Sequence, residues 1–392
     1  MKPATQCVRF GVSTDPWGAV SPPIYQTATF RQPGATEFGD YDYTRTANPT
    51  RSLLEQQLAN LEGGRYASAF ASGMAAITAI TRLLNTRDEI IAGDDLYGGT
   101  VRLLEQILER QSISVQFADT TDPAAVSKLV TDRTKLVLVE TPSNPFLRIS
   151  DIRQLARIAG DAGALLAVDN SMLSPLLQQP LALGADIVIH SATKFLGGHS
   201  DVTAGAVITN DKALHERIAF LQNAEGAGLS PFESWLLLRG LKTLALRVER
   251  QNSSAAEVVK FLETLPQVKK VFYPGLENQP GHEIHRNQSE GDGSVISFTT
   301  GDEEFSGRVV EAAKLFDIAV SFGSVASTIS LPCRMSHASI PAALKDRLAP
   351  PPDLVRISVG IEDAGDLIAD LEQAFVSAST RVSVAALGNK WC

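Results

Sequence analysis

The sequence contains few cysteines and no long apolar run. Cys7, Cys333 and Cys392 are the three cysteines, and this odd, widely spaced set does not predict a disulfide framework. The first residues lack an apolar run long enough for a signal peptide. Further along, every apolar run is too short to cross a membrane. We therefore expect a cytoplasmic protein without a membrane partner.

The sequence also lacks an excess of positive charge. Its 35 Lys and Arg residues are outnumbered by 44 Asp and Glu, which gives a formal net charge of -9. Binding to nucleic acid or to an anionic membrane requires a basic surface. We expect a small-molecule partner instead, since a local basic pocket for one phosphate is compatible with this charge.

Signatures of several enzyme classes are missing. His282 and His285 are closely spaced, but their i,i+3 separation differs from the His-Glu-x-x-His spacing of zinc proteases. No cysteine lies near them in the sequence, so we expect no metal site. The chain has neither a Gly-x-Ser-x-Gly element nor a Walker phosphate loop.

Length and composition predict two domains and an arm. The 392 residues, 44% of them hydrophobic, suffice for two cores. Residues 1–48 are rich in Pro, Gly, Thr and aromatics and lack helical periodicity. We expect them to form an extended N-terminal arm that wraps a neighbouring subunit or is a mobile tail. Residues 49–245 are predicted to form a large domain, and residues 246–392 a smaller α+β domain.

Short apolar segments alternate with helical segments in the large domain. Helices are predicted at 51–62, 74–84, 152–162 and, without a strong break, 232–252. The strand candidates are 66–70, 89–92, 114–117, 136–139, 165–168, 187–189 and 206–208, followed by 270–273 and 295–298 in the C-terminal domain. This alternation predicts a mostly parallel α/β sheet covered on both faces. Ligands of such sheets bind at the carboxyl ends of the strands.

Lys194 and Asp169 each follow a predicted strand. A desolvated lysine has a lowered pKa, so its neutral amine can attack an aldehyde, although most strand-end lysines are solvated. Pyridoxal phosphate (PLP) enzymes need a carboxylate that keeps the pyridine nitrogen protonated. Asp169 is placed to supply one, although a strand-end Asp often caps a turn. Tyr97, at another strand end, can stack on a flat ring or simply fill the core.

A phosphate site is predicted between the strand at 66–70 and the helix that follows. A helix that begins with a small residue offers unpaired N–H groups to a phosphate, and an ordinary serine N-cap is the alternative. Hydroxyl groups beside Lys194 can complete the site. The candidate phosphate-binding residues are Ser72, Gly73, Met74, Ser191 and Thr193.

Further motifs occur in order along more than 300 positions. They occupy residues 23–30, 41–51, 72–76, 94–100, 168–170, 191–194 and 354–363. Together they resemble the cystathionine/methionine-metabolism family of fold-type I PLP enzymes. The resemblance implies a fold-type I PLP transferase-like architecture and a homo-oligomer, commonly a dimer of dimers. Ala47 is one departure, at a position where family members commonly have Gly.

The resemblance implies roles for the cofactor-binding residues. Lys194 would hold PLP as a Schiff base, Asp169 would pair with the pyridinium nitrogen, and Tyr97 would stack on the ring. Asn144 would lie near the phenolic oxygen of the cofactor. The phosphate would be held by Gly73, Met74, Ser191 and Thr193, joined by Tyr43 and Arg45 from the neighbouring subunit.

The resemblance also implies a sulfur amino acid as substrate. Arg356, assisted by Ser321, would bind its α-carboxylate, a task suited to the bidentate guanidinium group. Lys194 would then remove the Cα proton. Methionine γ-lyases have Cys at the position of Gly99, and γ-acting members have Glu at the position of Ala326.

Residues 222–228, 320–325 and 332–341 resemble the plant-type β-lyases of the family. We therefore expect α,β-elimination of L-cystathionine to homocysteine, pyruvate and ammonia in methionine biosynthesis. The alternatives are a γ-acting relative (cystathionine γ-synthase or γ-lyase, or O-acylhomoserine sulfhydrylase) and a PLP-binding regulator without turnover.

Overall fold

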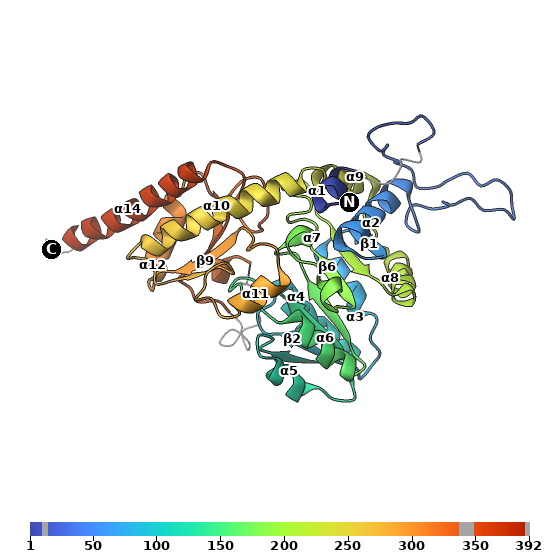
Figure 1. Ribbon diagram of the computed structural model, residues 1–392, viewed down its shortest axis with the longest axis horizontal. Helices are drawn as coiled ribbons and strands as arrows, with labels where there is room; N and C mark the ends of the chain where they lie inside the picture. Colours follow the sequence, from blue (N-terminus) through green and yellow to red (C-terminus); the bar gives the residue numbers. More distant parts are fainter. Residues whose placement is uncertain (10–14, 337–348, 389–392) are drawn as a thin grey trace.

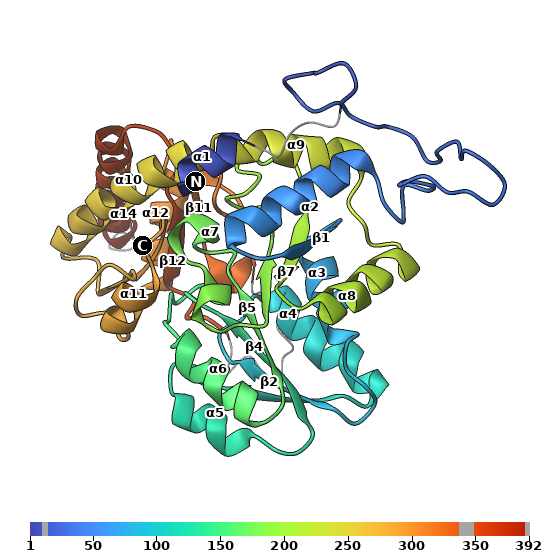
Figure 2. The same cartoon turned by 45° about the vertical axis from the view of Figure 1, so that its right-hand side comes forward.

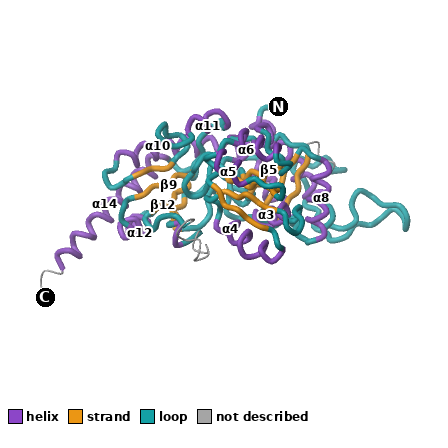
Figure 3. The backbone as a smooth tube through the Cα atoms, turned by 90° about the horizontal axis from the view of Figure 1, so that it is seen from below, coloured by secondary structure: helices purple, strands orange, loops and turns teal. Residues whose placement is uncertain are grey.

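Two sheets lie side by side along the long axis of the molecule (Figures 1 and 3). The computed structural model describes residues 1–9, 15–336 and 349–388. The larger sheet has seven strands, in the spatial order β1 (Tyr66–Phe70), β7 (Gly205–Thr209), β6 (Ile187–His190), β5 (Leu165–Asp169), β4 (Thr134–Glu140), β2 (Glu89–Gly93) and β3 (Ser114–Ala118). β7 runs antiparallel to both of its neighbours, and the remaining pairs are parallel. The predicted α/β class with a mostly parallel sheet is confirmed.

Helices cover both faces of the larger sheet, because apolar residues alternate between two cores along each strand. Val137 and Val139 of β4 pack with α5 (Pro123–Leu129) and α6 (Ile152–Asp161). Leu136 and Leu138 face the opposite core, with α3 (Gly73–Thr81), α4 (Gly98–Leu103) and α8 (Lys212–Ala224). Figure 2 shows α2 (Pro49–Glu62) and α9 (Pro231–Leu241) side by side over β1 and β7. The short segments are η1 (Leu104–Leu108), η2 (Glu109–Gln111), α7 (Ser174–Leu177), η3 (Pro180–Leu183) and η4 (Pro332–Arg334).

The smaller sheet has one apolar face and one face directed at the larger sheet. Its five strands follow the order β10 (Asp317–Ile318), β11 (Thr328–Ser330), β12 (Leu354–Ser358), β9 (Val295–Thr299) and β8 (Lys270–Phe272). Val355 and Ile357 of β12 pack in a core with α10 (Leu244–Thr264), α12 (Glu303–Ala312) and α14 (Ala364–Gly388). Arg356 lies between them, so its side chain points to the other face. There its register partner Ser297 donates a hydrogen bond to the carbonyl oxygen of Pro145, 2.7 Å away, in the larger domain.

The connection between the sheets differs from the continuous helix predicted at 232–252. Two helices, α9 and α10, meet at a break around Lys242 and Thr243. The carbonyl oxygen of Gly240 accepts a hydrogen bond from the guanidinium of Arg247, 2.9 Å away. Apolar periodicity runs across this short break and therefore could not reveal it. α11 (His282–Gln288) lies between β8 and β9 in the chain.

The N-terminal segment also differs in part from its prediction. Residues Pro3–Val8 form a helix, α1, whose Cys7 is fully buried in the core with Leu54 and Leu58 of α2. Much of the segment 15–47 does extend away from the body as an arm (Figures 1 and 2), whereas Pro22 is buried and its carbonyl oxygen accepts a hydrogen bond from Trp235 Nε1 at 3.0 Å. A bridge between Thr29 and Tyr43 closes its loop. The domain boundaries at residues 48 and 245 stay a prediction.

Three further expectations concern membrane spans, disulfide bonds and the β-lyase-like motif. Across the described residues, no helix is both long and apolar enough to cross a membrane. Cys7 and Cys333 are free thiols, and Cys392 lies outside the described residues. Residues 337–341 of the β-lyase-like motif also lie outside them.

Candidate active site

A cavity of about 540 Å³ lies at the carboxyl ends of β4, β5 and β6 and is also lined by Arg356 of the smaller sheet and by the loop at residues 320–322. The structure brings most of the predicted site residues together there. Those that line the cavity are Ser72, Gly73, Met74, Tyr97, Asn144, Asp169, Ser191, Thr193, Lys194, Ser321 and Arg356. Within the described part of the chain, no cluster of His, Cys, Asp or Glu suited to a metal ion was found.

Lys194 lines the cavity and contacts the smaller domain. Its Nζ donates a hydrogen bond to Ser321 Oγ at 2.6 Å and lies 4.9 Å from the ring centroid of Phe322. Burial and the nearby Arg356 guanidinium lower the pKa of Lys194 to about 8, while Asp169 and Glu140 oppose this shift. About a tenth of the amine is therefore neutral at pH 7, and the neutral form is the one that acts as a nucleophile or a base.

Two carboxyl groups end neighbouring strands beside Lys194. Asp169 closes β5 and Glu140 closes β4, in register with each other. Burial raises the pKa of Asp169, whereas the hydroxyl of Ser171 and the charge of Lys194 lower it. A positively charged ring nitrogen next to Asp169 would favour its ionised form further.

The start of α3 forms the phosphate end of the cavity. Ser72 is the N-cap of this helix, and its Oγ accepts a hydrogen bond from the Ala75 N–H at 3.1 Å. Ser72 therefore is a helix N-cap, which was the alternative to a phosphate-binding role. It also lines the cavity. A Cβ on Gly73 would lie 2.9 Å from the Cβ of Ser191. Glycine thus lets the N–H groups of α3 and the hydroxyl of Ser191 converge, which suits a phosphate.

Tyr97 is the N-cap residue of α4, lines the cavity and is 40% exposed. Its backbone N–H donates a hydrogen bond to Glu140 Oε2 at 3.0 Å. A Cβ on Gly99 would lie 2.5 Å from Tyr97 Cε1. The absence of a side chain at position 99 therefore permits the position that the Tyr97 ring adopts.

Arg356 reaches the cavity from β12 of the smaller sheet. Its Nη1 donates to Asn144 Oδ1 at 2.8 Å, and its Nη2 donates to the carbonyl oxygen of Ser321 at 2.9 Å. Burial lowers the pKa of Arg356 to about 10, and Glu140 opposes the shift. The guanidinium thus stays charged at neutral pH, and its two hydrogen bonds fix its position at the cavity. Ser321 has a φ of 85°, a strained conformation of the kind found at functional sites.

Nine lining residues were not among the predicted site residues, and three of these nine have charged or aromatic side chains. Glu140 ends a strand just as Asp169 does, so the same signal could have identified it. Arg102 lies on α4, five residues after Tyr97, and a basic residue in the last turn of a helix has an ordinary explanation in the helix dipole. Phe322 lies within 6 Å of both Lys194 Nζ and Arg356 Cζ, and no sequence pattern indicates this.

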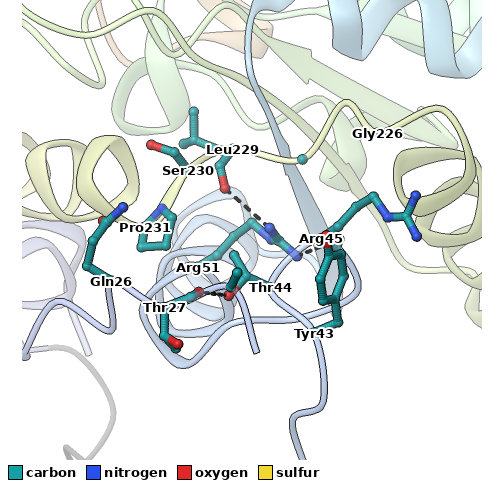
Figure 4. A pocket seen from close by; sticks show the side chains of 12 residues that line it. Gln26, Thr27, Tyr43, Thr44, Arg45, Arg51, Gly226, Leu229, Ser230 and Pro231 are labelled. Carbon is teal, nitrogen blue, oxygen red and sulfur yellow. Dashed lines mark hydrogen bonds between the residues drawn. The ribbon is translucent and has the colours of Figure 1, made fainter. Parts of the chain in front are cut away.

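Tyr43 and Arg45 lie outside the cavity. They line a separate pocket of about 440 Å³ at the base of the arm (Figure 4). There Arg51 donates hydrogen bonds to the carbonyl oxygens of Arg45 and Leu229 at 3.1 and 3.2 Å. The predicted phosphate contacts of Tyr43 and Arg45 belong to the cavity of a neighbouring subunit, so they stay a prediction.

The residues of the cavity fit PLP: they include a strand-end carboxylate, a buried lysine and the start of a helix with a glycine that a Cβ would crowd. A family model described as "Cys/Met metabolism PLP-dependent enzyme" matches residues 4–376. The chain belongs to this family. The predicted family, the fold-type I architecture and the PLP cofactor are thereby confirmed.

Curated relatives and solved structures agree with this assignment. The chain is 52% identical over 372 residues to chloroplastic cystathionine beta-lyase of Arabidopsis thaliana, covering 95% of this chain and 80% of the relative. It is 49% identical to cystathionine gamma-lyase of Bacillus subtilis, covering 95% and 99% of the two chains. A structure of cystathionine gamma synthase from Xanthomonas oryzae in complex with cystathionine superimposes with a TM-score of 0.95 at 39% identity, covering 97% and 99%. The chain is a PLP-dependent carbon–sulfur lyase, as predicted.

Proposed function

We propose that this enzyme catalyses the α,β-elimination of L-cystathionine to homocysteine, pyruvate and ammonia, as a step of methionine biosynthesis. The observation that carries the proposal is the convergence of Lys194, Asp169 and Arg356 in one cavity. These residues supply a base, a partner for the cofactor ring and a carboxylate-binding group. The β-lyase named above, 52% identical, supports the same substrate.

Each residue has a defined task in this reaction. Bound PLP acts as the electron sink that makes the Cα proton of an amino acid acidic. Arg356 binds the α-carboxylate and thereby orients the Cα–H bond. Lys194, whose amine is partly neutral, takes the Cα proton. Asp169 keeps the ring nitrogen charged, and the thiolate then leaves Cβ without a second proton removal.

Two positions favour β- over γ-chemistry. γ-Elimination needs an additional proton removal at Cβ, and therefore further groups that move protons. Position 326 holds an exposed Ala where the γ-acting members have Glu. Position 99 holds Gly, and a Cys at this position would press against the Tyr97 ring. A γ-lyase is the second candidate, since the Bacillus subtilis relative with that name is 49% identical.

We further propose that the active sites are completed in a homo-oligomer, a dimer or a dimer of dimers in the cytoplasm. Tyr43 and Arg45 would reach the phosphate end of the neighbouring chain's cavity. The arm supports this assignment, because Trp17, Val20 and Phe38 are 90%, 100% and 76% exposed on it. Large apolar side chains grouped on one segment commonly mark a protein interface.

Product analysis tests the proposal. Purified enzyme with PLP is incubated with L-cystathionine, and the keto acid and thiol are identified. Pyruvate with homocysteine supports the proposal, whereas 2-oxobutyrate with cysteine makes the chain a γ-lyase. A protein that binds PLP and cleaves nothing would be the regulator. Lys194→Ala is the control, because loss of a general base lowers the rate about 10²- to 10⁴-fold.

A further inference from the structure

Helix α10 carries two buried polar side chains on the face that meets the active-site loops. Arg247 is 3% exposed, and Gln251, one turn further along, is fully buried. The helix runs from the large domain across the smaller one (Figure 1). A polar group that loses its water needs hydrogen-bond partners. Arg247 donates hydrogen bonds to the loop that presents Lys194 and to Gly240 and Thr243 at the junction of α9 and α10, and Gln251 donates one to the loop that presents Ser321.

Arg247 fixes the turn that follows Lys194. Its Nη1 donates to the carbonyl oxygen of Phe195 at 2.7 Å, and its Nε donates to Thr243 Oγ1 at 3.0 Å. Gly198, with a φ of 72°, closes the same turn, and a Cβ there would overlap the guanidinium group. The turn from Lys194 to Gly198 is therefore shaped around the Arg247 side chain.

Gln251 fixes the loop that contains Ser321. Its Nε2 donates to the carbonyl oxygen of Ser324 at 2.7 Å. The two loops also bind each other: the Val325 N–H donates to the carbonyl oxygen of Gly198 at 2.9 Å, and Ser200 Oγ donates to Ser324 Oγ at 3.0 Å. One helix thus holds two loops that come from different domains.

We propose that Arg247 and Gln251 are positioning residues, which hold these two loops in one register and so set the 2.6 Å contact between Lys194 Nζ and Ser321 Oγ. Neither is among the residues that line the cavity, so both act through Lys194 and Ser321. The inference rests on the proposed function for the role of Lys194. It is independent of which sulfur amino acid is cleaved.

Gln251→Met gives the sharpest test. It keeps the length of the side chain and removes one hydrogen bond, since Gln251 Oε1 has no partner. Arg247→Lys is the second variant. It retains the positive charge but loses the planar guanidinium group, whose three nitrogens donate the hydrogen bonds. The control is Arg250→Lys on the same helix, where Arg250 contacts the carbonyl oxygen of Glu362 at the surface. All are compared as holoenzymes by kcat, KM, thermal unfolding and the pH dependence of the absorbance of bound PLP.

We expect kcat to fall about tenfold or more in Gln251→Met, with KM changed less than about threefold, because a misplaced base slows proton transfer without weakening carboxylate binding. The pH midpoint of the absorbance change of bound PLP should fall by about half a unit, since the protonated nitrogen of Lys194 loses the Ser321 hydroxyl as a hydrogen-bond acceptor. The charged groups that face Lys194, namely Arg356, Asp169 and Glu140, are the same in every variant. Arg247→Lys should lower both kcat and the pH midpoint, as Gln251→Met does, and Arg250→Lys should change neither.

A lower unfolding temperature with unchanged kcat and unchanged midpoint would overturn the inference, because it would leave Gln251 with a structural role alone. Borohydride reduction followed by peptide mass analysis separates this failure from failure of the proposed function. If wild-type protein carries no PLP on Lys194, the proposed function fails and the inference with it. If every variant carries PLP on Lys194 and retains its kcat and midpoint, the inference alone fails.

Discussion

Replacement of Glu140 by Gln is expected to stabilise the folded protein as the pH rises. Burial, with the neighbouring Asp169 carboxylate as the next cause, raises the pKa of Glu140 well above 4.5. The unfolded chain therefore releases this proton at lower pH than the folded chain does. Above pH 4.5 the native state binds more protons, so the free energy of unfolding falls with rising pH until the folded-state pKa is passed. The decrease is at most about 1.4 kcal/mol per pH unit, or about 2.7 kcal/mol over two units.

Gln at position 140 removes this dependence without removing the local hydrogen bond. Its side-chain oxygen can accept the Tyr97 N–H, which now lies 3.0 Å from Glu140 Oε2. Glu140→Leu is the matched contrast, because it also removes the charge but leaves that N–H unpaired, at a cost of about 1–3 kcal/mol. Urea unfolding of the PLP-free protein, at one protein concentration and several pH values between 5 and 8, measures both effects. If the free energy of unfolding depends on pH in the same way in wild type and in Glu140→Gln, the reasoning is refuted, since Glu140 would then ionise without cost.

Three further outcomes are expected. Arg356→Lys should lower kcat/KM about 10- to 100-fold, because it loses the bidentate fork and with it about 1.5–3 kcal/mol, and Arg250→Lys should leave steady-state kinetics unchanged. Gly99→Ala should weaken PLP binding about 2- to 10-fold in a fluorescence titration, since its Cβ would displace the Tyr97 ring and stacking contributes about 0.5–1.5 kcal/mol; an unchanged Kd would contradict this. The rate of PLP capture by the PLP-free protein should rise with pH and level off above about 8, because the pKa of Lys194 is about 8; a rise that continues to pH 10 in stopped-flow absorbance would contradict it.

The sequence predicted the larger sheet well because each strand contains a short apolar run bounded by polar residues. β1 spans Tyr66–Phe70, as predicted, and the remaining strands of this sheet differ by one or two residues at their ends. Asp169 and Lys194 converge because parallel strands place their carboxyl ends at one edge. This rule holds without knowledge of any side-chain packing.

Features that depend on tertiary contacts could not be predicted in this way. The break between α9 and α10 depends on a guanidinium group that binds the Gly240 carbonyl oxygen. The burial of Cys7 depends on α1 packing against the rest of the chain, whereas the composition of the arm indicates only irregular structure. Phe322 contributes to the site through a loop that no periodic pattern describes.

The separation of Tyr43 and Arg45 from the cavity of their own chain has a genetic consequence. If each cavity borrows these residues from its neighbour, two defective alleles can complement each other within one oligomer. A chain with an altered Tyr43 and an intact Lys194, paired with a chain of the opposite kind, would contain one fully intact site and one doubly defective site. Random mixing of the two inactive proteins as dimers would then restore about a quarter of wild-type activity.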